Sequence, residues 1–335
     1  MTLREAVLAA IREKPGEWVS GEALSQSLKV TRTTIWKQVK ILQAEGYAVQ
    51  TSPKKGYRLS SLPDILSQEE VGRGLGTEVF GKEQYFYFQE IDSTNNYAKQ
   101  LAAQGYPEGT LVIAEQQTAG RGRRGRQWHS EPGQCIFMSL ILRPSLPLKE
   151  LSRITLFIAV AVVDTLERFG IKSGIKWPND VLINGRKIAG ILTEAVTDMD
   201  GIEYIVTGIG LNINNRIVDF PEEVRGVATT VREETGCLIS RVEVLQEFLW
   251  QLEKSYRQML SGGFKEILEK VRSLSLVIGR DVKIDSVNGI TSGRAIDIDN
   301  DGFLMVRDSM GNIHRVMSGE ILIKAESDNS QTMLT

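Results

Sequence analysis

Residues 120–128 read Gly120-Arg121-Gly122-Arg123-Arg124-Gly125-Arg126-Gln127-Trp128. Three glycines and four arginines occupy the first seven of these positions, and an indole closes the stretch. Glycines let a backbone turn its N–H groups inward, arginines supply rigid forks of donors, and a tryptophan can cover an apolar part of a ligand. The stretch predicts a loop that wraps an anionic ligand. A basic surface turn is the alternative that these residues alone leave open.

Two known kinds of phosphate-binding loop do not fit this stretch. It matches the G-x-G-x-x-G pattern of dinucleotide-binding folds, and the apolar residues 111–114 before it predict a strand. That fold requires a helix opening at the third glycine, whereas residues 127–134 contain Pro132 and Gly133 and lack a helical apolar period. A Walker loop requires Lys followed by Ser or Thr where this chain has Arg126-Gln127.

Length and composition bound the remaining possibilities. The 335 residues have room for two or three domains, and a net charge of -2 means that nucleic-acid binding would need a local basic patch. Two cysteines and two histidines are too few for a disulfide framework or a structural zinc site. The longest apolar run, 154–163, is shorter than the roughly 20 residues of a membrane span. We therefore expect a cytoplasmic protein with no membrane partner.

Residues 1–62 supply such a basic patch. Apolar residues recur at helical spacing in three segments, the last two separated by a tight turn at Lys29-Val30, and two short strands follow. From residue 29 to residue 58 there are seven basic residues and one acidic residue. This layout predicts a winged helix-turn-helix that binds DNA, with a protein-interaction module as the alternative. The expected DNA contacts are Thr31, Arg32, Thr33, Thr34, Trp36, Lys37, Lys54 and Lys55.

A ligand-binding body is predicted after a linker at residues 60–64. Ser67 and Glu70 form a possible capping box, and Asp92 or Ser93 can cap a helix from Tyr97. Such a cap does not exclude ligand contact, because hydroxyls at a helix start can face a pocket. Further strands are expected at 85–90 and 136–142, and helices at 148–169 and 236–260.

Two further stretches carry chemistry. Residues 176–180, Lys-Trp-Pro-Asn-Asp, precede a predicted hairpin whose turn is Asn184-Gly185. Lys187 then starts an apolar strand, where it could hold a fixed charge near a ligand, although an ordinary surface lysine is the alternative. Residues 208–214 alternate glycine with apolar residues at the end of a strand, a pattern typical of close approach by a ligand. Residues 215–228 would form a loop able to close over the site.

These motifs, in this order and spacing, resemble the biotin-protein ligase family. The motifs are Asp-Ser-Thr-Asn at 92–95, Gln117 with the stretch at 120–128, and residues 176–180, 185–192 and 208–214. With the winged helix and four short strands predicted after residue 276, the chain resembles the bifunctional bacterial members that also repress the biotin operon. The resemblance implies an α+β protein: a winged helix-turn-helix at 1–62, a mixed-sheet, class II synthetase-like ligase domain at 63–272, and an SH3-like β-barrel at 273–335.

The resemblance also implies a two-step reaction. The carboxylate of biotin attacks the α-phosphorus of ATP, whose charge Mg²⁺ neutralises, to give biotinyl-5'-adenylate and pyrophosphate. A lysine of the biotin carboxyl carrier protein of acetyl-CoA carboxylase, or of another biotin-dependent carboxylase, then attacks the adenylate. Operator DNA and, in the adenylate-bound state, a homodimer are the other implied partners. The rival functions are a lipoate-protein ligase and a ligand-responsive repressor with an inactive catalytic body.

The family's functional positions map onto individual residues of this chain. Arg121, Arg123 and Lys187 are the implied catalytic cations, and Asp180 would orient or deprotonate the acceptor lysine. No protein cluster is expected to hold a metal. The implied adenylate contacts are Arg121, Arg123, Trp128, Lys187 and Asn212. The implied biotin contacts are Ser93, Thr94, Asn95, Gln117, Gly120, Arg121, Arg123, Trp128, Lys187, Gly190, Gly208 and Gly210.

Overall fold

The computed structural model describes residues 2–14, 16–60, 64–129, 131–197, 201–287 and 289–323. The chain divides into two compact units, Met1–Ile65 and Leu66–Thr335. Most of the predicted linker at 60–64 lies outside the described residues. Within the described ranges, no helix has the length and apolar character needed to cross a membrane.

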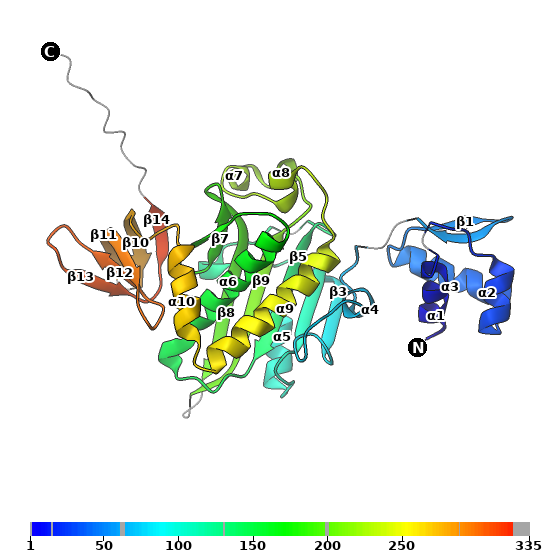
Figure 1. Ribbon diagram of the computed structural model, residues 1–335, viewed down its shortest axis with the longest axis horizontal. Helices are drawn as coiled ribbons and strands as arrows, with labels where there is room; N and C mark the ends of the chain where they lie inside the picture. The colour runs from blue at the N-terminus through cyan, green and yellow to red at the C-terminus, as the bar shows by residue number, and fades with distance from the viewer. Residues whose placement is uncertain are drawn as a thin grey trace, which may run out of the picture. The chain divides into compact units, whose positions relative to one another are not determined.

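The first unit is a helix-turn-helix followed by a β-hairpin (Figure 1), which confirms the predicted fold. Lys29 adopts a left-handed conformation that ends the second helix, and Thr31 caps the third by accepting a hydrogen bond from the Thr34 amide. Apolar residues of all three helices and both strands form one core. The elements are α1 Leu3–Arg12, α2 Gly21–Leu28, α3 Arg32–Ala44, β1 Val49–Ser52 and β2 Gly56–Leu59.

The hairpin is joined to the segment before α2. Val19 and Tyr57 exchange backbone hydrogen bonds of 2.7 and 2.9 Å. Gly56 has a φ of +97°, and a Cβ at this position would lie 2.1 Å from the Val19 carbonyl oxygen. This close approach therefore requires glycine.

The second unit is built on a seven-stranded mixed sheet in the order β3-β4-β5-β9-β8-β7-β6. Strands β3 and β4 are parallel and every other neighbouring pair is antiparallel. The predicted central mixed sheet is thus confirmed. Its strands are β3 Tyr85–Ile91, β4 Leu111–Gln117, β5 Cys135–Leu142, β6 Gly174–Lys176, β7 Asp180–Ile183, β8 Arg186–Thr197 and β9 Ile202–Asn212.

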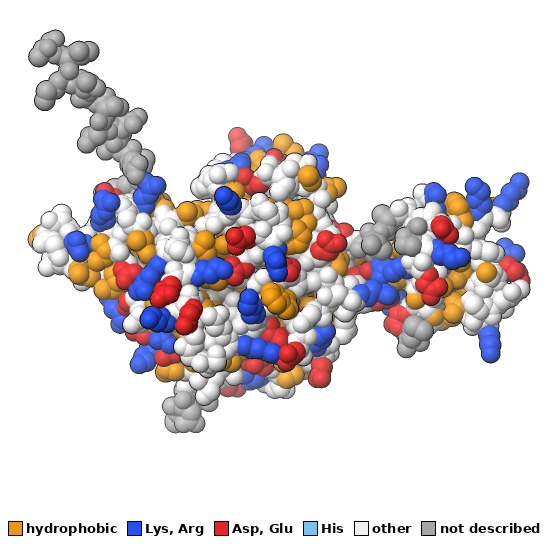
Figure 2. Space-filling model, in the orientation of Figure 1, with side chains coloured by type: hydrophobic (Ala, Val, Ile, Leu, Met, Phe, Trp, Pro, Cys, Tyr) orange, Lys and Arg blue, Asp and Glu red, His pale blue; other side chains and the backbone are white. Residues whose placement is uncertain are grey.

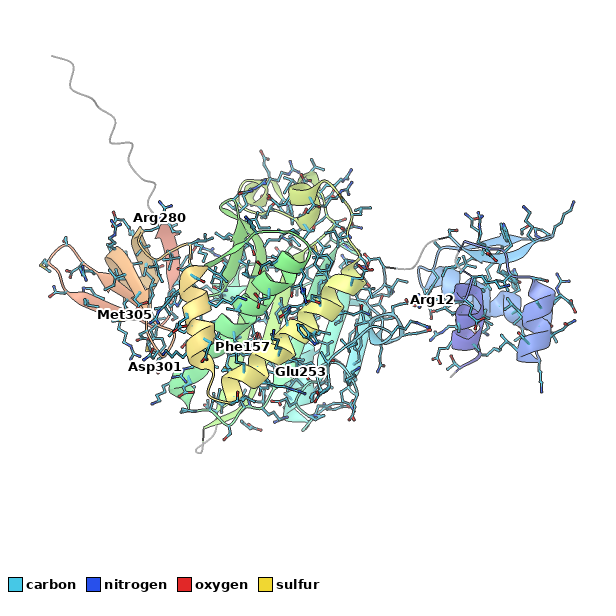
Figure 3. All side chains as sticks on the ribbon, viewed as in Figure 1. Arg12, Phe157, Glu253, Arg280, Asp301 and Met305 are labelled. Carbon is cyan, nitrogen blue, oxygen red and sulfur yellow. The ribbon has the colours of Figure 1, made fainter. Side chains whose placement is uncertain are left out.

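Helices cover the two faces of this sheet differently. On one face α6 (Leu151–Arg168), α9 (Arg241–Leu260) and α10 (Phe264–Ser273) pack side by side, as Figure 1 shows. Phe157 of α6 and Glu253 of α9 lie on this face (Figure 3), and the Glu253 carboxylate accepts three backbone N–H groups of residues 78–80. The other face carries the short helix α5, Thr94–Ala103. Part of this second face is left for a ligand site.

Several predicted element bounds differ in the structure. The helix predicted from Tyr97 begins at Thr94, with Ser93 as its cap. The glycines of the 208–214 stretch lie inside β9 rather than beyond its end. The predicted helix at 236–260 is wrong at its start, because Gly236 ends α8 (Val231–Thr235) in a left-handed conformation and α9 begins at Arg241.

Short helices, η3 Ile217–Asp219 and α7 Glu222–Arg225, occupy the predicted loop at 215–228. The other helices are α4 Gln68–Gly72, η1 Arg123–Gly125 and η2 Leu148–Glu150.

The C-terminal strands form an antiparallel sheet in the order β13-β12-β11-β10-β14. Four of these strands were predicted, and the fifth, β14, pairs with β10 at its edge. The sheet packs on the rest of the second unit: the Trp177 indole donates to the Gly302 carbonyl at 3.0 Å, and Arg272 pairs with Asp297 at 2.7 Å. Its strands are β10 Asp281–Ser286, β11 Gly289–Ile298, β12 Leu304–Arg307, β13 Ile313–Val316 and β14 Glu320–Ile323.

A buried ion pair fixes the start of the second unit. Arg241, at the beginning of α9, donates to Glu115 of β4 at 2.6 Å, and the two residues are only 2% and 6% exposed. Glu115 also accepts the backbone N–H of Leu66 and the hydroxyl of Tyr87, each at 3.1 Å. One carboxylate therefore joins the first residue of this unit to the sheet and to α9.

Arg241→Met should lower the free energy of unfolding by about 3–5 kcal/mol, because it leaves the Glu115 carboxylate buried without its partner. Urea denaturation of the full chain measures this change. Arg216→Met, which removes an exposed ion pair with Asp219, is the matched control and should cost no more than about 1 kcal/mol. Equal losses of unfolding free energy in the two variants would show that burial of the Arg241–Glu115 pair adds nothing to stability.

Candidate functional site

A cavity of about 50 Å³ lies on the sheet face that carries α5, between the start of that helix, residues 120–128 and strands β8 and β9. Alternation along the strands places Ser139 and Gly208 on this face, since Ile141 and Val206 pack against α5. The lining residues are Ser93, Thr94, Asn95, Gln117, Arg121, Gly122, Arg123, Trp128, Met138, Asn179, Lys187, Gly190, Ile191, Leu192, Gly208, Ile209 and Gly210.

Most of the residues expected to bind biotin or the adenylate line this one cavity. Three of the expected site residues do not. Gly120 lies at the base of the loop, where its carbonyl accepts the Trp128 amide at 3.0 Å. Asn212 is buried and donates to the Thr229 carbonyl, and Asp180 is paired with Lys187. The sequence reasoning missed Asn179 as a lining residue, although it belongs to the 176–180 stretch.

The floor of the cavity is made of glycines. Gly190 and Gly210 are direct partners across β8 and β9. The Trp128 indole lies on them, so that a Cβ at either position would come within 2.6 and 2.5 Å of the ring. The indole Nε1 is buried and has no hydrogen-bond partner among the described residues. The ring therefore occupies the floor with an unused donor.

A β-bulge aims Lys187 into the cavity. In the pairing of β7 with β8, Val181 faces Ala189 and Leu182 faces Lys187, so Ile188 is an extra residue. Lys187 and Gly190 are three residues apart and would point to opposite faces of a regular strand, yet both line the cavity. The Lys187 ammonium lies 2.6 Å from an Asp180 carboxylate oxygen and 5.1 Å from the centre of the Trp128 ring.

Residues 120–128 form a tight hairpin, called here the Gly-Arg hairpin. Gly122 donates to the Arg126 carbonyl at 2.7 Å, and Arg124 and Gly125 at the tip have φ values of +56° and +73°. A positive φ at a non-glycine residue is uncommon, so the tip is sterically demanding. The expected loop thus has a backbone structure of its own and closes one side of the cavity.

The four arginines of the Gly-Arg hairpin divide into two pairs. Arg121 donates to Asn96, and Arg123 donates to Asn179 at 3.2 Å; both line the cavity. Burial lowers the pKa of Arg123. Arg124 and Arg126 instead pair with Asp285 and Glu320 of the C-terminal sheet. Only the first pair is placed to meet an anion in the cavity.

The end of the cavity nearest α5 carries uncharged polar groups. The backbone N–H and the hydroxyl of Thr94 both donate to the Gln117 amide oxygen, at 2.8 and 3.1 Å. The Gln117 side chain, which also lines the cavity, is thereby tied to the start of α5. The Ser93 hydroxyl accepts the Asn96 amide as the helix cap. Arg121 also reaches this region, because it donates to Asn96 of α5, so the cavity combines neutral polar groups with the cations Arg121, Arg123 and Lys187.

The residues expected to contact DNA lie on the first unit. Seven of the eight are exposed, and Thr34 is half-buried. Figure 2 shows Lys and Arg side chains projecting from this unit beside β1. The Trp36 indole is 49% exposed, with Lys40 over its ring. The sequence reasoning missed Trp18, whose ring lies 4.9 Å from Arg58 and 6.0 Å from Lys55 and so supports the basic hairpin.

Family models and solved structures match this arrangement and define a class of protein. The Biotin/lipoate A/B protein ligase family matches residues 85–212, an HTH domain matches 3–58, and the Biotin protein ligase C terminal domain matches 277–324. The biotin protein ligase of Aquifex aeolicus in complex with biotin and ATP is 31% identical, with a TM-score of 0.62 over 72% of this chain and 99% of that chain. The class is that of protein ligases with an added DNA-binding unit.

Curated relatives narrow the class. The bifunctional ligase/repressor BirA of Bacillus spizizenii is 42% identical over 96% of this chain and 98% of its own length. The bifunctional ligase/repressor BirA of Escherichia coli is 31% identical over 92% and 94% of the two chains. This chain belongs to the family of bifunctional ligase/repressors.

Gly208→Ala should lower the free energy of unfolding by about 1–3 kcal/mol, because the new Cβ would lie 2.2 Å from the buried Asn95 amide oxygen. Thermal unfolding measures the loss. Gly226→Ala is the control, since no atom lies within 4 Å of its Cβ position and its φ is -79°. An equally stable Gly208→Ala variant would show that Asn95 is free to move.

Proposed function

We propose that the protein ligates biotin to a lysine of a biotin carboxyl carrier protein with ATP, and represses transcription by binding operator DNA. The observation that carries the ligase function is the lining of one cavity, which holds neutral donors and acceptors, the cations Arg123 and Lys187, and a glycine floor. Biotin has a neutral ureido ring and an anionic carboxylate, which match these two kinds of group. The Aquifex aeolicus structure, with biotin and ATP bound, supports this assignment.

In the first step the biotin carboxylate attacks the α-phosphorus of ATP, and pyrophosphate leaves. Two anions must approach each other, so the main task of the protein is to neutralise charge and fix geometry. Arg123 holds a fork of donors at the cavity wall, steadied by Asn179. Lys187 adds a point charge at the reacting carboxylate, and Asp180 holds that ammonium in place. Neither residue forms a covalent intermediate.

In the second step the amine of the carrier lysine attacks the carbonyl carbon of biotinyl-5'-adenylate, and AMP leaves. The amine must lose a proton. Asp180 lies beside the cavity, next to Lys187, so it could accept that proton or orient the amine. Trp128 covers the glycine floor, so the indole must shift or share that surface when biotin is bound.

The Mg²⁺ that accompanies ATP needs little from the protein. The described residues contain no group of three or more His, Cys, Asp or Glu side chains that could hold a metal. Mg²⁺ in nucleotide sites is bound by phosphates and waters with one or two carboxylates. Asp180 is the carboxylate that could contribute here, and the ion would neutralise the phosphate charge of ATP.

The proposed function also bears on the domain division, the location of the protein in the cell and the role of Asn212. The three-domain division at 1–62, 63–272 and 273–335 is supported by the three family matches at 3–58, 85–212 and 277–324. A cytoplasmic location suits a ligase whose substrates include ATP and a carrier protein. Asn212 does not line the cavity, so we propose that it supports adenylate binding indirectly. Its amide donates to the Thr229 carbonyl, and the Thr229 N–H donates to the Lys187 carbonyl.

Two rival functions are less well supported. A lipoate-protein ligase shares the family model, but the similar Aquifex aeolicus structure is a biotin protein ligase with biotin and ATP bound. A repressor with an inactive body would not need Lys187 and Arg123 in one cavity. Mass spectrometry of a biotin carboxyl carrier domain, incubated with the full chain, Mg²⁺, ATP and either biotin or lipoate, separates the three. A mass increase of one biotin supports the proposal; an increase with lipoate alone, or no increase, contradicts it.

Lys187→Ala should retain biotin binding and lose adenylate synthesis by about 10²–10³-fold, the usual cost of removing one charge that stabilises a transition state. Biotin-dependent exchange between pyrophosphate and ATP measures this step without the carrier protein. Lys172→Ala, an exposed lysine away from the cavity lining, is the matched control. Unchanged exchange in Lys187→Ala would remove Lys187 from the mechanism.

Repression requires that ligand and DNA favour the same state of the protein. We infer that bound adenylate orders the Gly-Arg hairpin and favours a homodimer, which would match a palindromic operator. Biotin with ATP should therefore tighten binding to promoter DNA of biotin genes in a gel-shift assay. Lys54→Ala should weaken this binding and leave carrier biotinylation unchanged. It should also reduce the slope of log K against log[salt] by about one, the value of one lost phosphate contact. A gel shift unaffected by biotin and ATP would contradict the coupling.

A further inference from the structure

A charged pair, Glu194 and Lys99, lies behind the cavity residue Asn95. Glu194 of β8 accepts a hydrogen bond from the Lys99 ammonium at 2.9 Å with one carboxylate oxygen. Its other oxygen accepts the side-chain amide N–H of Asn95 at 2.8 Å. Lys99 and Asn95 are four residues apart on α5, and Glu194 reaches both from the neighbouring strand. The sequence motifs pointed to Asn95 but to neither of the charged residues.

Glu194 is the nearer of two acceptors that orient the Asn95 amide: its carboxylate lies 2.8 Å from the amide nitrogen, and the Leu192 carbonyl lies 3.4 Å from it. An ionised carboxylate only accepts hydrogen bonds, so the amide nitrogen of Asn95 must face it. Burial acts to raise the pKa of Glu194, but the hydrogen bonds from Asn95 and Lys99 outweigh it and lower the pKa. Glu194 is therefore ionised at neutral pH. The amide oxygen of Asn95 is left on the opposite side, where the Ser139 hydroxyl donates to it at 2.5 Å.

This orientation fixes the hydrogen-bonding pattern of the cavity wall. Asn95 is 5% exposed and lines the cavity beside Gly208. An amide oxygen has two acceptor sites, of which Ser139 uses one. The Gln117 amide, whose oxygen accepts both hydrogen bonds from Thr94, lines the same cavity. A cyclic urea has two N–H donors and one carbonyl acceptor, and therefore needs both kinds of group.

We propose that Glu194 is a positioning residue for recognition of the ureido ring of biotin. It keeps the Asn95 oxygen directed toward Ser139 and the cavity, and Lys99 holds the carboxylate in place. This inference rests on the proposed function, in which the cavity takes biotin. Glu194 itself does not line the cavity and acts only through Asn95.

Glu194→Gln is the informative substitution because it keeps the shape of the side chain. Glutamine has a single acceptor oxygen, and the charged Lys99 competes for it more strongly than the neutral Asn95. The glutamine NH₂ then faces Asn95. The Asn95 amide turns its oxygen toward residue 194, and its own N–H groups face the cavity, where they meet the N–H donors of the ureido ring. The KM for biotin should rise about tenfold, the value of one buried hydrogen bond, while kcat and the KM for ATP stay unchanged.

Removal of Lys99 as well should reverse the effect. In Lys99→Met/Glu194→Gln no ammonium competes, so the glutamine oxygen is free to accept the Asn95 N–H as Glu194 does. The KM for biotin should return to within about twofold of the starting value. If the ion pair only stabilised the fold, the second substitution would bring no recovery. This rescue separates positioning from stability.

The measurements are steady-state pyrophosphate exchange for the wild type and both variants, with the melting temperature of each. Glu69→Gln, which removes the carboxylate of a surface ion pair with Arg73, is the matched control and should leave the KM for biotin unchanged. An unchanged KM in Glu194→Gln, or a KM that stays raised in the double variant, overturns the inference. Failure of the wild type to transfer biotin would instead overturn the proposed function.

Discussion

The site depends on positions of the sheet that have no side chain. Gly190 and Gly210 face each other across β8 and β9, and Gly208 lies one row away, paired with Leu192 on one side and Ser139 on the other. Any Cβ at these positions would collide with the Trp128 ring or the Asn95 amide. The indole, the hairpin that carries it and the start of α5 can approach the sheet only because this floor is bare.

The cavity brings two kinds of chemistry together. Its positive groups come from different elements: Arg121 and Arg123 from the Gly-Arg hairpin and Lys187 from the bulged start of β8. Its hydroxyl and amide groups gather at the start of α5, where Gln117 and Ser93 also accept the backbone N–H groups of Thr94 and Asn96. A ligand with a neutral ring and an anionic tail would find partners for both parts in this one cavity.

Local sequence patterns predicted what local geometry decides. The cap at Ser93 and the Asn184-Gly185 turn follow from residues close in the chain, and both are present. The extra residue Ile188 was not predictable, because a bulge is defined by pairing with another strand. The same holds for the division of the four arginines, which depends on Asp285 and Glu320 far along the chain. Glu194 was missed since its role exists only through Asn95 on a different element.

The Gly-Arg hairpin is held in two unlike ways. Its base is closed by backbone hydrogen bonds to Gly120 and Arg126, whereas its tip meets the C-terminal sheet through ion pairs whose side chains are 33–68% exposed. Dissolved salt screens such exposed pairs and leaves backbone hydrogen bonds almost untouched. Ionic strength therefore acts on the attachment of the tip alone. The hairpin can come away from the C-terminal sheet without losing the shape that covers the cavity.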